Sequence, residues 1–562
     1  MATTDSATDS TTGSTADQPT AQPACPWPTL RRYDGGAHLC VNGRPRLLLG
    51  GQLHNSTPSD PTATAEAMDL IRDLGGNLVI GSASWHLVEP EEGVFDFHLV
   101  DAQVEAARRR GLHLVLIWFG AFKNAASTYA PRWVRADTAR FPRVVRGGDE
   151  VGPVAFEQVG AKPVLSVFST QLVDADRRAL VALSTHLART DGDHTVVMVQ
   201  VENETGLLGS ARDHGPAAQE AWDGEVPEDL TTYLAAHEAS LHPSLRELWV
   251  ARGRRRTGTW AQVLGEDWRA EEVFQAWHTA RYVEALASAS RDVLPVPHYT
   301  NAWLGPQPGQ DRAGQYPSGG PASTVIDVWK VAAPSLDLLG PDIYVDDAKA
   351  AVAGYRRGDN PLFVPESRIR TGSLLWALGQ GAFGFSVFGI DDARRGSQLS
   401  CAFVLLGSME GQVLAAQREG RLTGVLLEAG ETATVVLDGG VRLELAGSRD
   451  TLARMFLDAG VEVVLDPPAR EPETVRGAVP AAADARAMGL VLDEGEGRFL
   501  LLGQGLMVSA CDVQGNPVEV DDVWEGTFVD GTWVPGRNLN GDERLEIVPM
   551  DELGLARVRL LC

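Results

Sequence analysis

Cysteine, long apolar runs and basic clusters are all scarce in this sequence, and each scarcity argues against a class of protein. The cysteines are scattered, odd in number and without CxxC spacing, so neither a disulfide framework nor a zinc site is indicated. They number five: Cys25, Cys40, Cys401, Cys511 and Cys562. We therefore expect free thiols in a reducing, cytoplasmic compartment. No run of about 18 or more apolar residues occurs, so we expect no membrane span.

Basic residues are outnumbered by acidic ones along the whole chain. The chain has 49 lysines and arginines and 75 aspartates and glutamates, which gives a formal charge of -26. A nucleic-acid partner requires a basic surface, so we expect none and favour a neutral substrate. Residues 1–27 are rich in Ser, Thr, Asp and Ala and lack the basic start and apolar core of a signal peptide. They are predicted to form a disordered tail.

Short apolar strands alternate with helical segments across residues 28–392. The predicted strands cover 46–53, 77–82, 113–119, 196–201, 296–303, 336–344, 361–366 and 384–390, and the clearest helices cover 63–74, 99–110, 170–189 and 271–290. Eight such alternations predict an α/β fold, a (β/α)8 barrel. A doubly wound sheet is the competing fold. The segment LGGQLHNS after the first strand lacks the GxGxxG turn that such a sheet uses to bind phosphates.

The alternation of strands and helices ends after residue 392. One helical piece near 410–418 is followed by β-like runs separated by turn residues, which predicts a mostly β accessory region over 393–562. The runs cover 432–437, 441–445, 461–465, 498–502 and 506–511. A Pro/Ala/Arg-rich segment at 467–486 indicates one or two subdomains, with a boundary in that segment.

A cluster of acid and amide side chains ends the fourth predicted strand. Gln200, Glu202, Asn203 and Glu204 follow a run of valines. A buried carboxylate is costly unless it is paired, so such a cluster at the carboxyl end of a barrel strand indicates a site. A solvated loop or a structural ion pair is the alternative. Asn203 and Glu204 can both reach a pocket only if the strand ends or bulges there, and on alternation alone Glu202 rivals Glu204.

Glu366 supplies a second carboxylate, at the end of the seventh predicted strand. All strands of a barrel open their carboxyl ends onto one face, so Glu204 and Glu366 are expected to face each other. Two carboxylates across a pocket are the minimal set for glycoside hydrolysis. One protonates the leaving oxygen and the other attacks the sugar or activates water. A pair with Arg368 is the alternative for Glu366.

Together these motifs resemble the glycoside hydrolase family 35 β-galactosidases, of the retaining (β/α)8 clan. QVENE at 200–204 with Gly206 matches that family, and WHLVEPEEGVFDF at 85–97 matches a motif shared with its relative, family 42. LNGDE at 539–543 resembles a β domain of unknown function in a bacterial branch of these enzymes. The resemblance implies an exo-β-glycosidase that releases terminal β-D-galactosyl residues by double displacement, without metal or cofactor.

The resemblance also implies roles for single residues. Glu204 would be the acid/base and Glu366 the nucleophile, with Asn203 holding the sugar 2-hydroxyl and Glu89 binding other hydroxyls. Tyr344 would donate a hydrogen bond to the nucleophile and help to keep it ionised, while a drier setting keeps Glu204 protonated.

Other expected contacts are less specific. Trp303 is a candidate for stacking on the sugar, and His54 fits as a ligand. Family 35 normally has a tyrosine where this chain has Asn55, and a carboxylate after the third strand where it has Lys123 and Asn124. Lys123 and Asn124 could supply substitute contacts to hydroxyls.

Several alternatives stay open. An α-L-arabinopyranosidase, or another β-glycosidase of the clan, is the nearest, because L-arabinopyranose shares the ring hydroxyl arrangement of galactose. A catalytically silent carbohydrate-binding barrel would be expected to lack one of the carboxylates. A metal-dependent hydrolase would need more than His54 and His298. A homo-oligomer is also compatible with the sequence.

Overall fold

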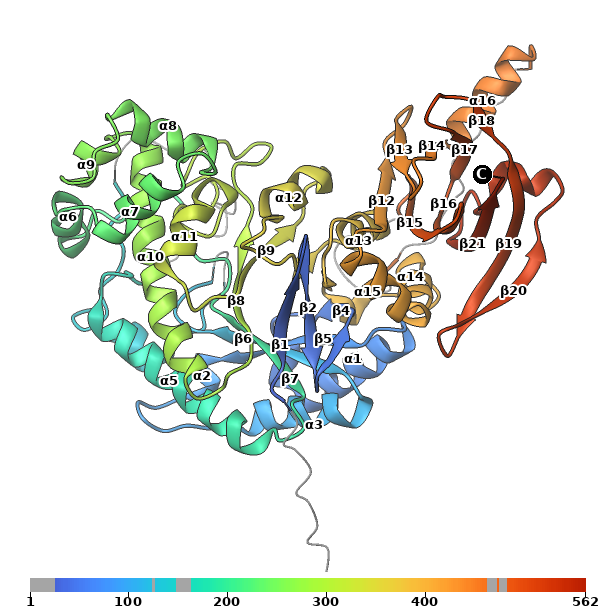
Figure 1. Cartoon of the computed structure of the whole chain (residues 1–562). Helices are drawn as coiled ribbons and strands as arrows, with labels where there is room; N and C mark the ends of the chain where they lie inside the picture. Colours follow the sequence, from blue (N-terminus) through green and yellow to red (C-terminus); the bar gives the residue numbers. More distant parts are fainter. Residues whose placement is uncertain (1–25, 124–126, 148–162, 462–472, 475–482, 562) are drawn as a thin grey trace, which may run out of the picture.

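An eight-stranded parallel barrel forms the larger part of the molecule (Figure 1). The computed structural model describes residues 26–123, 127–147, 163–461, 473–474 and 483–561. The barrel strands are β4 (Leu48–Gln52), β5 (Leu78–Ser84), β6 (His113–Phe119), β7 (Val196–Val201), β8 (His298–Trp303), β9 (Leu338–Ile343), β10 (Glu366–Ser367) and β11 (Gly384–Phe388). Their spatial order follows the chain order, and β11 pairs with β4. The predicted (β/α)8 fold is confirmed.

The seventh strand is much shorter than predicted. Only Glu366 and Ser367 form β10, although Val364 makes a single parallel bridge to Phe385. Ser386 donates its backbone N–H to the carbonyl of Val364 at 2.9 Å, which closes the ring. Pro365 has no N–H to donate, so the strand cannot form a continuous ladder at that point.

Helices cover the outside of the barrel, as the alternation of the sequence predicts. The helices that follow the strands are α1 (Pro61–Asp73), α2 (Trp85–Val88), α3 (His98–Arg110), α4 (Arg132–Ala136), α5 (Thr170–Thr190), α10 (Trp268–Arg291), α11 (Ile326–Ala332), α12 (Ala348–Tyr355) and α13 (Thr371–Gly379). Asp60 caps α1 through the N–H groups of Thr62 and Ala63, because Pro61 occupies the first helical position. Helix α3 ends at Gly111, whose φ of 64° suits glycine.

Two additions to the barrel were not predicted from the sequence. A three-stranded antiparallel sheet, β1 (Thr29–Tyr33), β2 (Gly36–Val41) and β3 (Arg44–Arg46), precedes it. Leu39 and Val41 of that sheet pack with the side chains inside the barrel, such as Leu48 and Leu78, so the sheet covers the end where the strands begin. Between β7 and α10 the chain adds α6 (Pro216–Asp223), α7 (Glu228–Ala236), α8 (Pro243–Ala251) and α9 (Trp260–Val263).

The C-terminal region contains two antiparallel sheets, as expected for a mostly β region. The first has the order β12-β15-β16-β21-β19-β20 and the second β13-β14-β17-β18. Their strands are β12 (Leu422–Leu427), β13 (Thr432–Val436), β14 (Arg442–Gly447), β15 (Ala487–Gly495), β16 (Arg498–Gln504), β17 (Leu506–Cys511), β18 (Pro517–Val518), β19 (Val520–Val529), β20 (Thr532–Asn538) and β21 (Gly554–Leu560). Buried residues of both sheets, including Val425 and Leu443, form one apolar cluster.

Three further helices belong to this part of the chain. They are α14 (Gln398–Ser408), α15 (Glu410–Arg418) and α16 (Ser448–Asp458). Residues 462–465 of one predicted strand, most of the proposed boundary at 467–486 and residues 1–25 of the predicted tail lie outside the described residues. Among those described, no single helix is long and apolar enough to cross a membrane. Helices α14 and α15 are long and apolar enough only when they are taken together, and the pair is bent by 73°. This result reflects length and composition alone.

The first C-terminal sheet packs directly against the barrel helix α13. Leu426 of β12 belongs to the same apolar cluster as Leu374 and Leu378 of α13. A Cβ atom on Gly379 would lie 2.0 Å from the backbone nitrogen of Gly424. Helix α13 and strand β12 therefore touch backbone to backbone at this point. The contact therefore requires glycine at residue 379.

We expect Gly379→Ala to destabilise the protein by about 1 to 3 kcal/mol, because the new methyl group overpacks this contact. The measurement is the midpoint of thermal unfolding. Gly407→Ala in α14 is the matched control, since no atom lies within 4 Å of its added Cβ. An equal midpoint for Gly379→Ala and the wild type would contradict the importance of this contact.

Candidate active site

The end of strand β7 turns sharply and sends Glu202 and Glu204 in different directions. The strand stops at Val201, and both glutamates adopt left-handed backbone conformations, with φ of 62° and 45°. Such conformations cost about 1 to 3 kcal/mol each for residues with a Cβ, so the surroundings must hold them. The backbone N–H of Glu204 donates to Oδ1 of Asn301 at 2.9 Å, and that of Glu202 donates to the carbonyl of Trp118 at 3.1 Å. The expected end of the strand is thus present.

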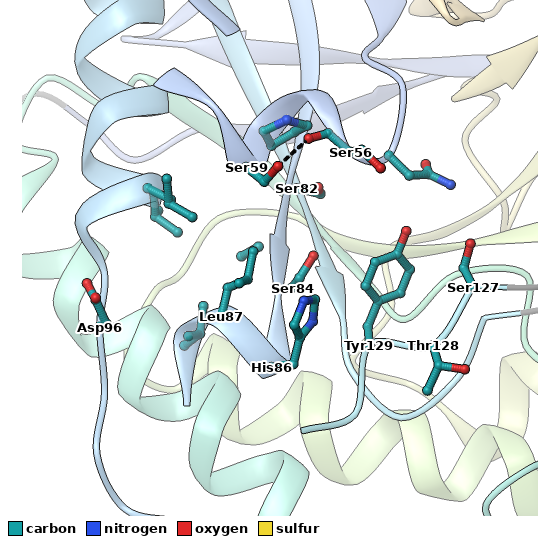
Figure 2. Close-up of a pocket in the computed structure, with 16 residues that line it drawn as sticks. Ser56, Ser59, Ser82, Ser84, His86, Leu87, Asp96, Ser127, Thr128 and Tyr129 are labelled. Carbon is teal, nitrogen blue, oxygen red and sulfur yellow. Dashed lines mark hydrogen bonds between the residues drawn. The ribbon is translucent and has the colours of Figure 1, made fainter. Parts of the chain in front are cut away.

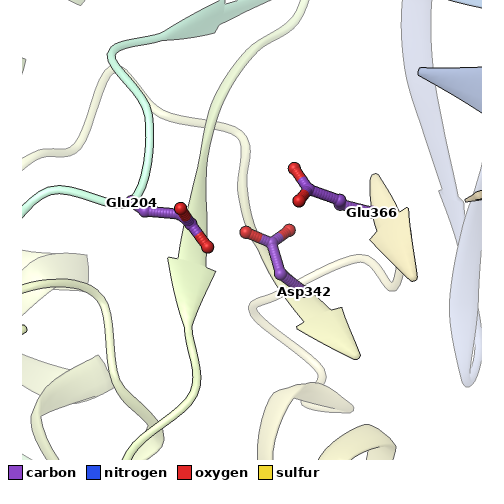
Figure 3. Close-up of side chains that lie close together, drawn as sticks. All are labelled: Glu204, Asp342 and Glu366. Atoms are coloured by element: carbon purple, nitrogen blue, oxygen red, sulfur yellow. The ribbon is translucent and has the colours of Figure 1, made fainter. Parts of the chain in front are cut away.

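Glu204 and Glu366 lie together at the carboxyl end of the barrel, with Asp342 beside them (Figure 3). One carboxylate oxygen of each residue lies within 4.8 Å of one oxygen of both others. All three are buried, with exposed fractions of 6%, 5% and 2%. The sequence predicted that the two glutamates meet, and the structure places them so. It did not predict Asp342, which lies next to the last residue of β9 and two residues before Tyr344.

Lys123 provides a positive charge in this cluster. Its Nζ atom lies 2.7 Å from Oε2 of Glu204. Burial alone would lower the pKa of Lys123, but the charges of Glu204 and Glu366 outweigh this effect and raise it. Lys123 forms a direct ion pair with Glu204, and its expected contact with substrate hydroxyls stays a prediction. Asn124, its predicted companion, lies outside the described residues.

The three carboxyl groups cannot all ionise easily in this space. Burial and the charge of Glu204 raise the pKa of Glu366 to about 7, against the opposing effects of Lys123 and of a hydrogen bond from Tyr344 to Oε1. Burial and the charges of Glu366 and Glu204 also raise the pKa of Asp342 well above its usual range. We expected Tyr344 to keep Glu366 ionised. The tyrosine is in place, but burial and the close carboxylate of Glu204 outweigh its effect on the pKa of Glu366.

Asn301 holds several groups of the cluster together. Its Oδ1 atom accepts from the backbone of Glu204 and from Gln200 Nε2, and its Nδ2 atom donates to Asp342 at 2.7 Å. Asn203 joins the network, because its Oδ1 accepts from Asn301 at 3.3 Å and its Nδ2 donates to Glu204 at 3.4 Å. Asn301 was missed, although its place at the end of the fifth strand is the signal that marked Glu204.

Glu202 points away from the cluster and forms a second buried acidic pair with Asp176 of α5. Its two oxygens accept from the backbone N–H groups of Ala121 and Phe122 at 3.0 and 2.9 Å. Burial and the charge of Asp176 raise its pKa well above the usual range, so the pair holds a proton. A Cβ atom on Gly120 would lie 2.4 Å from Glu202 Oε1, which explains the glycine. Glu202 is therefore not a rival for Glu204.

Glu89 has a structural position and not the expected sugar-facing one. It is completely buried, and its oxygens accept from Trp85 Nε1 at 2.8 Å and from the backbone of Gly93 at 2.7 Å. Arg178 contacts it at 3.4 Å. These bonds hold the loop that follows β5. The shared sequence motif around Glu89 thus reflects the folding of this loop.

His54 and Trp303 lie at the same end of the barrel but already have partners. His54 Nε2 lies 2.8 Å from Asp392 Oδ2, and its ring packs edge-on against Phe388. Trp303 is half-buried at the end of β8 and donates to Gln310 at 3.1 Å. Their roles toward a sugar stay predictions. His298 is buried and bonded to Ser290 and to the carbonyl of Val296, which is a structural role.

A cavity of about 320 Å³ opens at the ends of β4 and β5 (Figure 2). Its lining includes the hydroxyl groups of Ser82, Ser84 and Thr128, with the rings of His86 and Tyr129. None of the three clustered carboxylates lines it. Hydroxyl groups and rings of this kind suit a polar ligand such as a sugar. This cavity was not predicted from the sequence.

Part of the barrel is similar in sequence to a known family. The sequence profile of glycoside hydrolase family 42, described as β-galactosidase, matches residues 57–285. Residues 57–285, which form the first part of the barrel, are therefore similar to family 42. A profile described as a domain of unknown function, DUF5597, matches residues 399–549 and agrees with the expected C-terminal domain. Family 35 itself is not supported, but it belongs to the same clan as family 42. No curated protein matches the chain.

Several solved glycosidase structures are similar to this chain. A family 42 β-galactosidase of G. stearothermophilus is 12% identical over 92% of this chain and 98% of its own, with a TM-score of 0.44. The β-galactosidases of Marinomonas ef1 and Halorubrum lacusprofundi are 14% and 17% identical over 66% and 65% of this chain, with TM-scores of 0.42 and 0.43. This chain spans only 60% and 58% of their lengths. These scores are low, and the fold assignment depends on the strands described above.

The acidic cluster is also the place where a cation could bind among the described residues. Glu204, Asp342 and Glu366 offer oxygen ligands of the kind that hard divalent cations prefer. The ammonium group of Lys123 already lies against one of them. A metal at this position would have to compete with that charge.

We expect Glu202→Gln to change how stability depends on pH. The raised pKa of Glu202 means that its contribution is complete below the unfolded value of 4.5 and is lost as pH rises toward the folded value. Glutamine carries no such proton. From pH 5 to pH 8 the unfolding temperature should therefore fall more in the wild type than in Glu202→Gln. Glu220→Gln on exposed α6 is the control, and equal slopes for all three proteins would contradict the shared proton.

Proposed function

We propose that this protein is a retaining exo-β-glycosidase that hydrolyses terminal β-D-galactosyl residues, with Glu204 as acid/base and Glu366 as nucleophile. The observation that carries the proposal is the short separation of their carboxylate oxygens, within 4.8 Å. Retaining glycosidases keep their carboxyl groups about 5 to 5.5 Å apart, whereas inverting ones need about 6.5 to 9.5 Å to admit a water molecule. A nucleophile that attacks the sugar directly fits the short distance.

The reaction then follows from the positions of these groups. Glu366 attacks the anomeric carbon while Glu204 protonates the departing glycosidic oxygen, and the glycosyl–enzyme ester forms. Water then attacks the same carbon, with Glu204 accepting its proton, and Glu366 is released. Tyr344 donates to Glu366, and so stabilises the carboxylate before attack and after release. Asn203 is positioned by Asn301 to hold the 2-hydroxyl of the sugar.

Asp342 has a role in this proposal that the sequence did not suggest. Burial and the charges of Glu366 and Glu204 raise its pKa well above the usual range, which favours the neutral form, and it is hydrogen-bonded to Glu204. A neutral carboxylic acid can donate a hydrogen bond where an ionised one cannot. Asp342 thus holds a proton beside the acid/base and lessens the negative charge that Glu366 meets.

Galactose is the proposed sugar because the matching family is described as β-galactosidase. The α-L-arabinopyranosides are the second candidate, since L-arabinopyranose has the same ring hydroxyl arrangement. The resemblance to family 35 leads to the same reaction and sugar, so the choice between the two families does not alter the proposal. A silent binding barrel is not favoured, because both carboxylates are present and close. A cytoplasmic location is part of the proposal, supported by the scattered cysteines.

A panel of nitrophenyl glycosides tests the reaction and the sugar together. We expect hydrolysis of the β-D-galactoside, with the β-anomer of galactose as the first product by NMR. Glu366→Gly should lower kcat by roughly 10⁴-fold or more, because no other group can form the covalent intermediate. Glu220→Gln, at an exposed position of α6, is the control and should keep the wild-type activity. Full activity of Glu366→Gly would exclude it as the nucleophile, and an α-anomer as first product would exclude retention.

Glu204→Ala should discriminate between leaving groups. General acid catalysis contributes about 10²- to 10⁴-fold and matters most when the leaving oxygen is basic. We therefore expect a much larger loss on alkyl galactosides than on the dinitrophenyl galactoside. The ratio of kcat/KM for the two substrates, compared with the wild type, is the measurement. Equal losses on both substrates would remove Glu204 from the acid role.

The pH profile should report the raised pKa of the nucleophile. Glu366 must be ionised to attack, so kcat/KM should fall as pH drops below about 7, the pKa of this group. Tyr344→Phe removes a hydrogen bond that lowers this pKa, so its acid limb should move upward by about one pH unit. Tyr233→Phe on α7 is the control and should keep the wild-type profile. A downward shift in Tyr344→Phe would contradict this role.

A further inference from the structure

A separate cavity of about 220 Å³ lies beside the acid/base. Lys123 and Gly206 both line it, and they connect it to Glu204 from two sides. Lys123 bonds to the carboxylate of Glu204, and Gly206 follows Glu204 by two residues. The cavity is smaller than a typical site for a drug-sized ligand, about 300 to 1,000 Å³, and so suits a single small group.

The charge of this cavity is unusual for so acidic a protein. Its lining includes Lys123, Arg135 and Arg143, and no acidic side chain among the described residues lines it. Most arginines described elsewhere in the chain form ion pairs. Arg135 donates instead to the carbonyl of Ala130 at 2.9 Å, and Arg143 donates to the carbonyls of Phe141 and Arg135 at 3.2 and 2.8 Å.

Both guanidinium groups therefore keep donors and charge that no described carboxylate balances. Burial and the neighbouring charge of Arg135 lower the pKa of Arg143, which shows that the two cations repel each other. An anion between them would remove that repulsion. Guanidinium groups bind carboxylates and sulfates through paired N–H donors, and this geometry makes them more selective than lysine for such anions.

The position of the cavity identifies which part of a glycoside it would meet. Glu204 protonates the glycosidic oxygen, so the group attached to that oxygen extends from Glu204 and away from Glu366. The cavity adjoins Glu204 through Lys123 and Gly206, on the side of the loops that follow β6 and β7. The apolar side chains of Phe122 and Val164 add a wall against which a sugar ring can pack.

We propose that this cavity binds the leaving group of the substrate and selects a sugar that carries an anionic group, either a carboxylate, as in a uronate, or a sulfate ester. Arg135 and Arg143 bind the anion. The role of the cavity as a leaving-group site rests on the proposed glycosidase function. Binding of an anionic sugar by the cavity does not depend on that function. A neutral substrate, as expected from the net charge of the chain, would leave both arginines without an anionic partner among the described residues.

Equilibrium binding tests the site without any need for catalysis. Glucuronate, glucose 6-sulfate and glucose are titrated into the full-length protein, with isothermal titration calorimetry as the readout. We expect at least one anionic sugar to bind about tenfold or more tightly than glucose, since hydrogen bonds between charged groups are worth more than neutral ones. The better of the two anions identifies carboxylate or sulfate as the natural group. The preference should weaken in 0.5 M salt.

Variants assign the preference to the two arginines. Arg143→Gln and Arg135→Gln should each reduce the ratio of anion to glucose affinity at least about fivefold, because the glutamine amide lacks the charge. Arg132→Gln, on the exposed face of the same helix α4, should keep the wild-type ratio. The ratio is measured within one protein, so partial unfolding does not imitate the result. Equal affinity of the wild type for all three sugars, or an unchanged ratio in both variants, would overturn the proposal.

Kinetics separates this inference from the proposed function. Disaccharides with 1→3 and 1→4 linkages carry galactose on glucuronate or on glucose, and kcat/KM is compared within each linkage. We expect the uronate to be the better substrate by about tenfold in at least one linkage. Hydrolysis of both at equal rates overturns the anionic leaving group and leaves the glycosidase intact. Binding of glucuronate without hydrolysis of any glycoside overturns the glycosidase and supports the site.

Discussion

The ion pair between Lys123 and Glu204 determines the charge balance of the whole barrel mouth. Three carboxyl groups meet there in a space almost closed to water, and one ammonium group offsets only one of them. The remaining two are driven toward their neutral forms, as the raised pKa values of Asp342 and Glu366 show. Like charges at this distance in a buried site cannot all be ionised at once. Burial and mutual repulsion thus favour protons on Asp342 and Glu366, while Lys123 balances the charge of Glu204.

The turn after β7 separates two buried acidic groups that have different uses. Glu202 and Asp176 share a proton on the helix side of the sheet, where backbone N–H groups from residues 121 and 122 bind them. Glu204 points into the barrel, held by Asn301. Two left-handed residues at the turn make this division possible, and the Glu202 pair anchors the loop that presents Lys123. The outer pair thus fixes the position of the cation that the inner cluster requires.

The strands and the meeting of Glu204 with Glu366 could be predicted from the sequence because their signals are local. Apolar runs mark the strands, and acidic residues just after two of them mark Glu204 and Glu366. Asp342 was missed because a carboxylate within a run such as LDLLGPDIY gives no sign of its direction. Asn301 and Asp176 were missed because their partners lie far away in the chain. Glu89 was predicted to face the sugar, but it is buried against the loop after β5. A motif shared with a family does not show which way its glutamate points.

The C-terminal region is joined to the part of the barrel that carries Glu366. Helix α13 begins five residues after Glu366. In the first turn of this helix, the backbone N–H of Gly372 donates to the carboxylate of Asp484 at 3.1 Å. Strand β12 covers the other end of the same helix, at Gly379. A barrel expressed without residues 399–562 would lose both supports and expose the apolar side of α13 to water. The C-terminal region therefore supports the helix that follows Glu366, and the barrel is not a separable module.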